Sequence, residues 1–141
     1  MRKVQILITT HGYFAQELLK SAEMIVGNQD SNDVKTLCMT LGVDLEQFKE
    51  NMREVIKEFG ENRDVLILTD VIGGTPNNAA MCNMLTNSRV RAISGVNLPI
   101  LLEAFTNEDM DLEVLTDHLV SSGETSVIDI YKTFIKKEEA I

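Results

Sequence analysis

Two residues of this sequence, His11 and Asp70, have the types and surroundings that nucleophilic chemistry requires. Each follows a run of apolar residues, 6–8 before His11 and 65–68 before Asp70, and each precedes a stretch with helical features. An unprotonated imidazole nitrogen is a nucleophile, and a carboxylate that accepts the other ring N–H fixes the tautomer and stabilises positive charge on the ring. We therefore expect His11 and Asp70 to meet, with His11 carrying a phosphoryl group.

The residues that follow His11 and Asp70 can hold an anion. Helices expected to start at Gly12 and Thr75 offer backbone N–H groups and the positive ends of their dipoles. Gly73 and Gly74 let the backbone approach an anion closely, and the Thr75 hydroxyl can donate to it. No GxxxxGK[ST] loop and no evident pair of Mg²⁺-binding acids occurs in the sequence. We therefore expect a phosphate-binding site without a metal, a cofactor or a nucleotide.

The elements that position these residues follow from hydrophobic periodicity. Short apolar runs predict strands at residues 4–9, 34–40, 64–69 and 89–94, and helical spacing predicts helices at 12–26, 45–59, 98–105, 110–122 and from residue 75. Asp44 and Thr75 are the expected N-caps of their helices, and Pro76 fits a first helical turn. Residues 125–131 are rich in Val, Ile, Thr and Tyr, which predicts a late strand.

This alternation predicts an α/β fold with an open, mainly parallel four-stranded sheet and helices on both faces. In the flavodoxin-like order the first strand lies beside the third, and a crevice opens above their carboxyl ends. His11 and Asp70 then stand on opposite sides of that crevice, at a strand spacing of about 4.8 Å.

Length, charge and cysteine content restrict the class of protein. The 141 residues fit one domain, 1–141, and the net charge of −9 argues against a nucleic-acid partner. No apolar stretch approaches a membrane span, and no secretory leader is evident. Cys38 and Cys82 are far apart, which is typical of reduced, buried thiols in a cytoplasmic protein. The second histidine, His118, is expected on the surface of a helix.

The sequence resembles the enzyme IIA domain of the mannose family, which includes mannose, fructose and sorbose members, of the bacterial phosphoenolpyruvate-dependent sugar phosphotransferase system. The matching segments are 10–12 with Thr-His-Gly, 18–23, 70–80 with Gly-Gly-Thr-Pro, and 94–103 with Gly-Val-Asn-Leu-Pro. They occur in the family's order and extend over nearly the whole chain. Thr-His-Gly alone is a weak signal, whereas the last two motifs at these spacings are specific.

The resemblance implies a phosphotransferase component with a phosphohistidine intermediate. His11 would accept a phosphoryl group from phospho-HPr and pass it to a IIB component, which serves a membrane permease that the IIA domain reaches only indirectly. The supporting aspartate falls on Asp70 and the phosphate-contacting hydroxyl on Thr75. Because the sequence ends at residue 141, we expect IIB to be a separate protein.

Two further features follow from the resemblance. Family members are homodimers in which a late strand crosses to the partner's sheet, and residues 125–131 are the candidate here. Val71 and Ile72 depart from the family's usual residues after the aspartate. They line the crevice, so they bear on the preference for partner or sugar.

Three alternatives remain open. A phosphocarrier of the same fold can serve dihydroxyacetone kinase, although the Gly-Gly-Thr-Pro and Asn-Leu-Pro motifs favour sugar uptake. A flavodoxin needs a hydroxyl-rich loop after the first strand and aromatic residues flanking the flavin, whereas His11 interrupts that loop and the chain has no Trp. A two-component receiver would use Asp70 as its phosphoryl acceptor, but it needs an acidic pair after the first strand, where this chain has Thr9, Thr10 and His11.

Overall fold

The structure, a computed structural model, describes residues 2–136. Its strands are β1 (Val4–His11), β2 (Val34–Met39), β3 (Asp64–Thr69) and β4 (Val90–Ser94). Its helices are α1 (Phe14–Val26), α2 (Leu45–Glu58), α3 (Thr75–Thr86), α4 (Leu98–Thr106), α5 (Leu112–Glu124) and a short π-helix, η1 (Tyr131–Ile135). Across residues 2–136 we find no helix long and apolar enough to cross a membrane.

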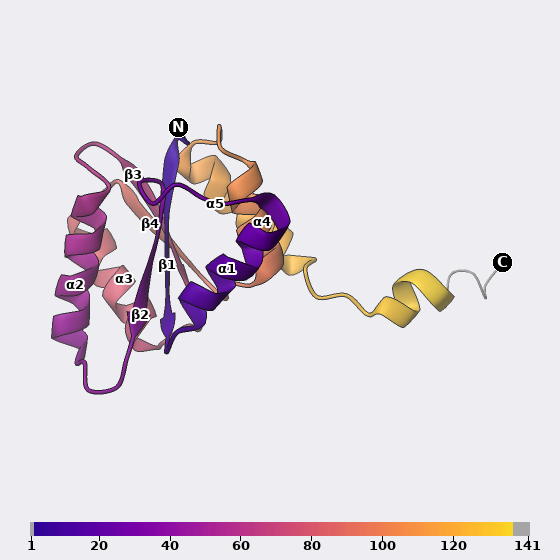
Figure 1. Cartoon of the computed structure of the whole chain (residues 1–141), viewed down its shortest axis with the longest axis horizontal. Coiled ribbons are helices and arrows are strands. Elements are labelled where there is room, and N and C mark those ends of the chain that lie inside the picture. Colours follow the sequence, from indigo (N-terminus) through magenta and orange to yellow (C-terminus); the bar gives the residue numbers. More distant parts are fainter. Residues whose placement is uncertain (1, 137–141) are drawn as a thin grey trace.

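The four strands form one parallel sheet in the order β2-β1-β3-β4, which confirms the predicted order. Helices α2 and α3 cover one face, and α1, α4 and α5 cover the other (Figure 1). The first and third strands are direct neighbours, with Thr9 of β1 paired to Thr69 of β3. The winding of the sheet therefore reverses between β1 and β3, at the position that the sequence predicts.

The middle of β1 is a continuous apolar run at residues 6–8 because helices cover both faces of the sheet. Ile6 and Ile8 point into the core beneath α1, α4 and α5, whereas Leu7 between them points into the core beneath α2 and α3. All three side chains are fully buried. A strand buried on both faces is a continuous apolar run rather than an alternating one, which is why the sequence around residues 6–8 identifies the centre of the sheet.

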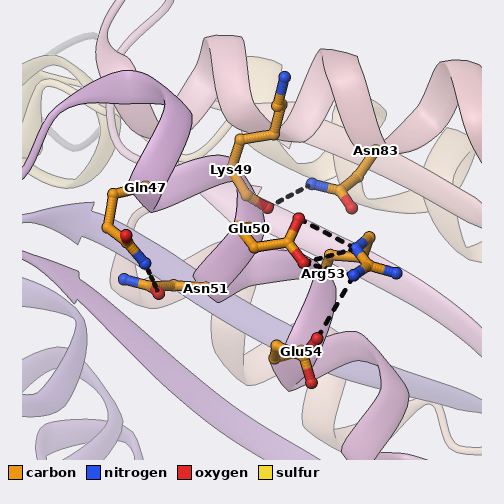
Figure 2. A network of polar contacts seen from close by, with 7 residues as sticks. All are labelled: Gln47, Lys49, Glu50, Asn51, Arg53, Glu54 and Asn83. Carbon is orange, nitrogen blue, oxygen red and sulfur yellow. Dashed lines mark hydrogen bonds and ion pairs between the residues drawn. The ribbon is translucent and has the colours of Figure 1, made fainter.

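Helix α2 and helix α3 are joined by a polar contact within their packed interface. The Asn83 side-chain amide, which is almost completely buried, donates to the backbone carbonyl of Lys49 on α2 at 3.3 Å and to that of Ala79 at 3.0 Å (Figure 2). On the exposed side of α2, Arg53 forms ion pairs with Glu50 and Glu54. The buried amide thus fixes α3, whose N-terminus belongs to the candidate site, against α2.

Several boundaries differ from those predicted. Strand β1 continues two residues beyond Thr9, because its pairing with β2 extends to His11 and Met39. Helix α1 therefore begins at Phe14 rather than Gly12, and the Thr10 hydroxyl accepts the backbone N–H of Ala15 at 2.7 Å. The predicted cap at Asp44 is confirmed, since its carboxylate accepts the Gln47 N–H at 2.8 Å.

The predicted late strand at residues 125–131 is wrong for the single chain. After α5 the chain forms a turn, bends and extended links, and then enters η1, which stands away from the rest of the molecule (Figure 1). A strand needs a neighbouring edge to satisfy its backbone N–H and C=O groups, and this segment does not pair with the edge strand β4. The exchange of this segment between two subunits stays a prediction.

Residues outside the site differ modestly from expectation. Cys38 and Cys82 are free thiols, as predicted, but both are only partly buried. His118 is half-exposed on α5, and its Nε2 atom lies 2.9 Å from Glu103 Oε2 on α4. The predicted surface position of His118 is therefore confirmed, and the ring also joins two helices.

Candidate active site

The structure brings His11 and Asp70 together at the carboxyl edge of the sheet. His11 is the last residue of β1, and Asp70 directly follows β3. The Oδ2 atom of Asp70 accepts the backbone N–H of His11 at 3.0 Å and lies 2.9 Å from its Nδ1 atom. The other carboxylate oxygen, Oδ1, accepts the backbone N–H of Val71 at 3.0 Å. One carboxylate therefore fixes both the backbone and the ring of His11, and is itself held by the next residue.

This contact determines which ring nitrogen of His11 can react. A carboxylate only accepts hydrogen bonds, so Nδ1 carries the hydrogen that faces Asp70 Oδ2. In the neutral ring Nε2 then has a free electron pair. The His11 side chain is 47% exposed and that of Asp70 only 16%. The supporting acid is thus covered, while the histidine is accessible to another molecule.

The environment of Asp70 favours its ionised form. Partial burial acts to raise the pKa of Asp70, but the hydrogen bonds from the His11 backbone N–H and imidazole, together with the charge of that ring when protonated, outweigh it. The pKa of Asp70 consequently lies below its ordinary value. The carboxylate can therefore remain charged while the ring of His11 acquires positive charge.

The loop at residues 71–74 leads into α3 on the other side of the ring. Gly74, not the predicted Thr75, is the N-cap of α3, and Thr75 is the first helical residue, followed by Pro76 as predicted. The reason is that the Gly74 backbone is extended while Thr75 is already helical. Gly73 has a φ of 82°, and its carbonyl accepts the Asn78 side-chain amide at 3.4 Å. Thr75 is partly buried at the start of this helix.

Gly12 does not begin a helix, although the sequence predicts one there. It adopts a φ of 57°, which favours glycine, and its backbone N–H donates to the Met39 carbonyl at 2.8 Å. The Gly12 N–H is therefore engaged with β2, and α1 begins two residues later. Gly12 shapes the turn that follows His11, whereas the start of α3 supplies the nearby helix end.

A cavity of about 490 Å³ adjoins the exposed side of His11, and the sequence analysis did not identify it. The turn after β1 and the end of β2 form its walls, which consist of His11, Gly12, Tyr13, Met39, Thr40 and Leu41. Leu41 is fully exposed and Tyr13 largely so. The neighbouring positions of the first two strands could have placed Met39 and Leu41 near His11, because parallel strands end at the same edge. No cluster of three or more potential metal ligands occurs within residues 2–136.

The fold and the site define a flavodoxin-like α/β protein with a histidine–aspartate pair at the point where the winding of the sheet reverses. Residues 5–120 match the family model described as PTS system fructose IIA component. The chain therefore belongs to this mannose-type IIA family of the phosphotransferase system, whose members carry phosphoryl groups in sugar uptake. This membership decides against the flavodoxin and receiver alternatives.

Individual relatives agree with this family. The chain is 32% identical over 124 residues to the PTS system fructose-specific EIIA component of Bacillus subtilis strain 168, a match that covers 87% of this chain and 84% of the relative. It is 34% identical over 108 residues to the mannose-specific EIIAB component of Escherichia coli K12, covering 77% of this chain and 33% of that longer protein.

A solved structure gives the same result in three dimensions. The mannose/sorbose-specific IIA subunit from Enterococcus faecalis superposes with a TM-score of 0.83 at 33% identity, and the match covers 91% of this chain and 95% of that one. The similarity thus extends over nearly all of both chains.

Proposed function

We propose that His11 is the phosphoryl-accepting residue of this IIA protein, that Nε2 is the reacting atom, and that the donor is phospho-HPr. The observation that carries the proposal is the contact between Nδ1 and Asp70 Oδ2, which reserves Nε2 for reaction. The electron pair of Nε2 forms a bond to phosphorus while the bond from phosphorus to the donor nitrogen breaks and its electron pair stays with the donor. His11 keeps its Nδ1 hydrogen, and Asp70 stabilises the positive charge on the ring.

The second transfer reverses this step toward a IIB component. A nucleophile of IIB attacks the phosphorus atom, and the electron pair of the P–Nε2 bond returns to the imidazole. The ring then regains its neutral tautomer, with the Nδ1 hydrogen still directed at Asp70. The membrane permease is served by IIB and is reached only indirectly by this chain, which we place in the cytoplasm.

The start of α3 is the proposed phosphate-binding element. This element lies at the same end of the sheet as His11. It offers the Thr75 hydroxyl, the backbone around Gly73 and Gly74, and the N–H groups of the first helical turn that have no partner within the helix. Gly12 contributes by shaping the turn behind the ring. Anions are stabilised at a helix N-terminus by about 0.3–1 kcal/mol at exposed sites.

The assembly we propose is a homodimer in which the segment after α5 packs on a second copy. This segment exposes large apolar side chains, among them Val127, Ile128, Ile130, Phe134 and Ile135. Strand β4 lies at the sheet edge, where a strand from another chain can pair. If residues 125–131 of one subunit paired with β4 of the other, they would cover the unpaired edge of β4 and bury apolar side chains of the segment.

Phosphorylation by phosphoenolpyruvate, enzyme I and HPr tests the central proposal. The modified residue is located by mass spectrometry under neutral conditions, because phosphohistidine is acid-labile and alkali-stable. We expect HPr-dependent phosphate on His11. Phosphate on a different residue contradicts the assignment, and transfer only from a donor other than HPr favours the carrier that serves dihydroxyacetone kinase.

A further inference from the structure

Gly74 lies directly against the reactive edge of the His11 ring. A Cβ atom built on Gly74 would be 2.7 Å from Cε1 of His11 and 3.3 Å from Nε2, and 3.4 Å from Cγ1 of Val71. The first of these distances is shorter than side-chain atoms tolerate, so a side chain at this position would force the ring or the loop to move. A cavity adjoins the exposed side of the ring, but a ring that moved into it would draw Nδ1 away from the Asp70 carboxylate to which it is hydrogen-bonded.

The backbone of Gly74 does not itself require glycine. Its φ of −80° and ψ of 171° are extended values that every residue adopts. Gly74 is moreover an N-cap, a position where Ser, Thr, Asp and Asn stabilise a helix by accepting a backbone N–H. The chain uses such caps elsewhere, with Asp44 accepting at 2.8 Å for α2 and Asn97 at 2.9 Å for α4. Helices α1, α3 and α5 have no side-chain cap, and at α3 a capping side chain would meet the neighbouring imidazole.

We propose that Gly74 is a positioning residue whose missing side chain lets the His11 imidazole lie against the start of α3 with Nδ1 on Asp70. This role differs from binding phosphate, because it acts on the ring before any phosphoryl group arrives. The link to reaction rate rests on the proposed function of His11. The effect on ring orientation does not, since it is measurable in the unphosphorylated protein.

Two substitutions separate ring positioning from helix stability. Gly74→Ala adds the Cβ alone, whereas Gly74→Ser adds a hydroxyl that can accept the Asn77 N–H and cap α3. We measure the imidazole tautomer by ¹H–¹⁵N correlation spectra, the rate of phosphorylation by phospho-HPr, and the thermal unfolding midpoint. Gly123→Ala is the matched control, because Gly123 is the other glycine outside the left-handed region and its Cβ would contact Ile100, not His11.

The expected result is a loss of ring order in both variants. In the wild type His11 should show a single tautomer with hydrogen on Nδ1, and both Gly74 variants should show a mixture of tautomers. Phosphorylation should slow by roughly a hundredfold, the cost of a misplacement of about 1 Å at a reacting centre. Gly74→Ser should unfold at a higher temperature than Gly74→Ala yet transfer no faster, whereas Gly123→Ala should keep both the tautomer and the wild-type rate.

A double variant gives a second and sharper criterion. If Gly74 acts by keeping the ring on Asp70, then adding Gly74→Ala to Asp70→Asn should cause much less further slowing than it does in the wild type. Full additivity of the two losses overturns the proposal. A Gly74→Ala protein that keeps the wild-type tautomer also overturns the proposal, at any rate of transfer. Slow transfer from an unchanged ring would mean that the added methyl group obstructs phosphate or the partner protein instead.

Failure of this inference and failure of the proposed function are distinguishable. Absence of phosphate on His11 in the wild-type protein contradicts the proposed function. The tautomer comparison between wild type and Gly74→Ala then still decides whether Gly74 orients the ring.

Discussion

Oδ2 of Asp70 is within hydrogen-bond distance of two atoms of His11, the backbone nitrogen at 3.0 Å and Nδ1 at 2.9 Å. The carboxylate thus joins the end of β1 to the loop after β3 and orients the imidazole at the same time. Because Asp70 holds both the backbone and the ring of the nucleophile, less conformational freedom of His11 has to be lost when transfer occurs. This relationship is the basis of the first three predictions.

Replacement of His11 by alanine should abolish phosphorylation while the fold is kept. The ring lies at the half-exposed edge of the sheet and is not part of the core. His118→Ala is the control, because His118 is the other histidine of the chain. It lies far from His11 in the sequence and pairs with Glu103. Labelling with radioactive phosphate checks both. Label retained in His11→Ala, or lost in His118→Ala, contradicts the assignment.

Asp70→Asn should slow phosphorylation at least roughly tenfold to a hundredfold, the range found for carboxylates that orient metal-bound histidines. The nucleophile remains, but the neutral amide neither selects one tautomer nor stabilises the positive ring as a carboxylate does. Single-turnover transfer from phospho-HPr measures the effect. A variant with the wild-type rate would remove Asp70 from the mechanism.

The low pKa of Asp70 also predicts how stability depends on pH. The pKa of Asp70 is lower in the folded state than its ordinary value of 3.8, so ionisation of Asp70 stabilises the fold at a pH above 3.8. The contribution should be lost as the pH falls from about 3.8 through the lower folded-state pKa. Urea unfolding of the wild type and Asp70→Asn should therefore differ at pH 7, and the difference should shrink on acidification below about pH 4. A difference that grows on acidification contradicts the assigned shift.

Val127→Asp should weaken the proposed dimer. Val127 is 89% exposed in the single chain, and a charge there opposes burial against a second copy. Met24→Asp is the matched control, because Met24 is equally exposed at 88% but lies on α1. Sedimentation velocity at micromolar concentration should show a shift toward monomer for Val127→Asp alone. A wild-type protein that is already a stable monomer would contradict the dimer itself.

Asn83→Ala should destabilise the fold by about 1–2 kcal/mol, because the buried amide donates to the Lys49 carbonyl of α2 and to the Ala79 carbonyl of its own helix. Asn51→Ala is the comparison, since Asn51 on the outer side of α2 accepts one hydrogen bond from Gln47 (Figure 2). Equilibrium urea unfolding should show a clear loss of stability for Asn83→Ala and little change for Asn51→Ala. Equal losses would mean that the buried contact adds nothing beyond an exposed one.

Much of the candidate site was predictable from local pattern. The apolar runs at residues 6–8 and 65–68 identified two buried strands, and their alternation with helices placed those strands side by side. His11 and Asp70 had to meet once that order was set, because parallel strands end at a common edge. The motifs in the sequence predicted the family, and the match of residues 5–120 to the family model confirmed that family.

Other features depended on pairing between segments, which local pattern does not encode. The end of β1 was placed at Thr9 because the apolar run ends there, whereas hydrogen bonding to β2 carries the strand on to His11. That extension delays α1 and engages the Gly12 N–H with Met39. The residues 125–131 have strand composition, but without a neighbouring edge in the single chain they form no strand.

The sequence by itself determined the order of the sheet, the pair of residues that can do chemistry, and the edge at which they meet. Burial explains this, since a strand covered on both faces must be apolar and its polar end must reach the surface. Only the tertiary structure decided that one oxygen of Asp70 orients His11, and that Gly74 lies against the ring at the start of α3. These contacts depend on distances of a few tenths of an ångström between segments far apart in the chain, and residue types and spacing do not specify such distances.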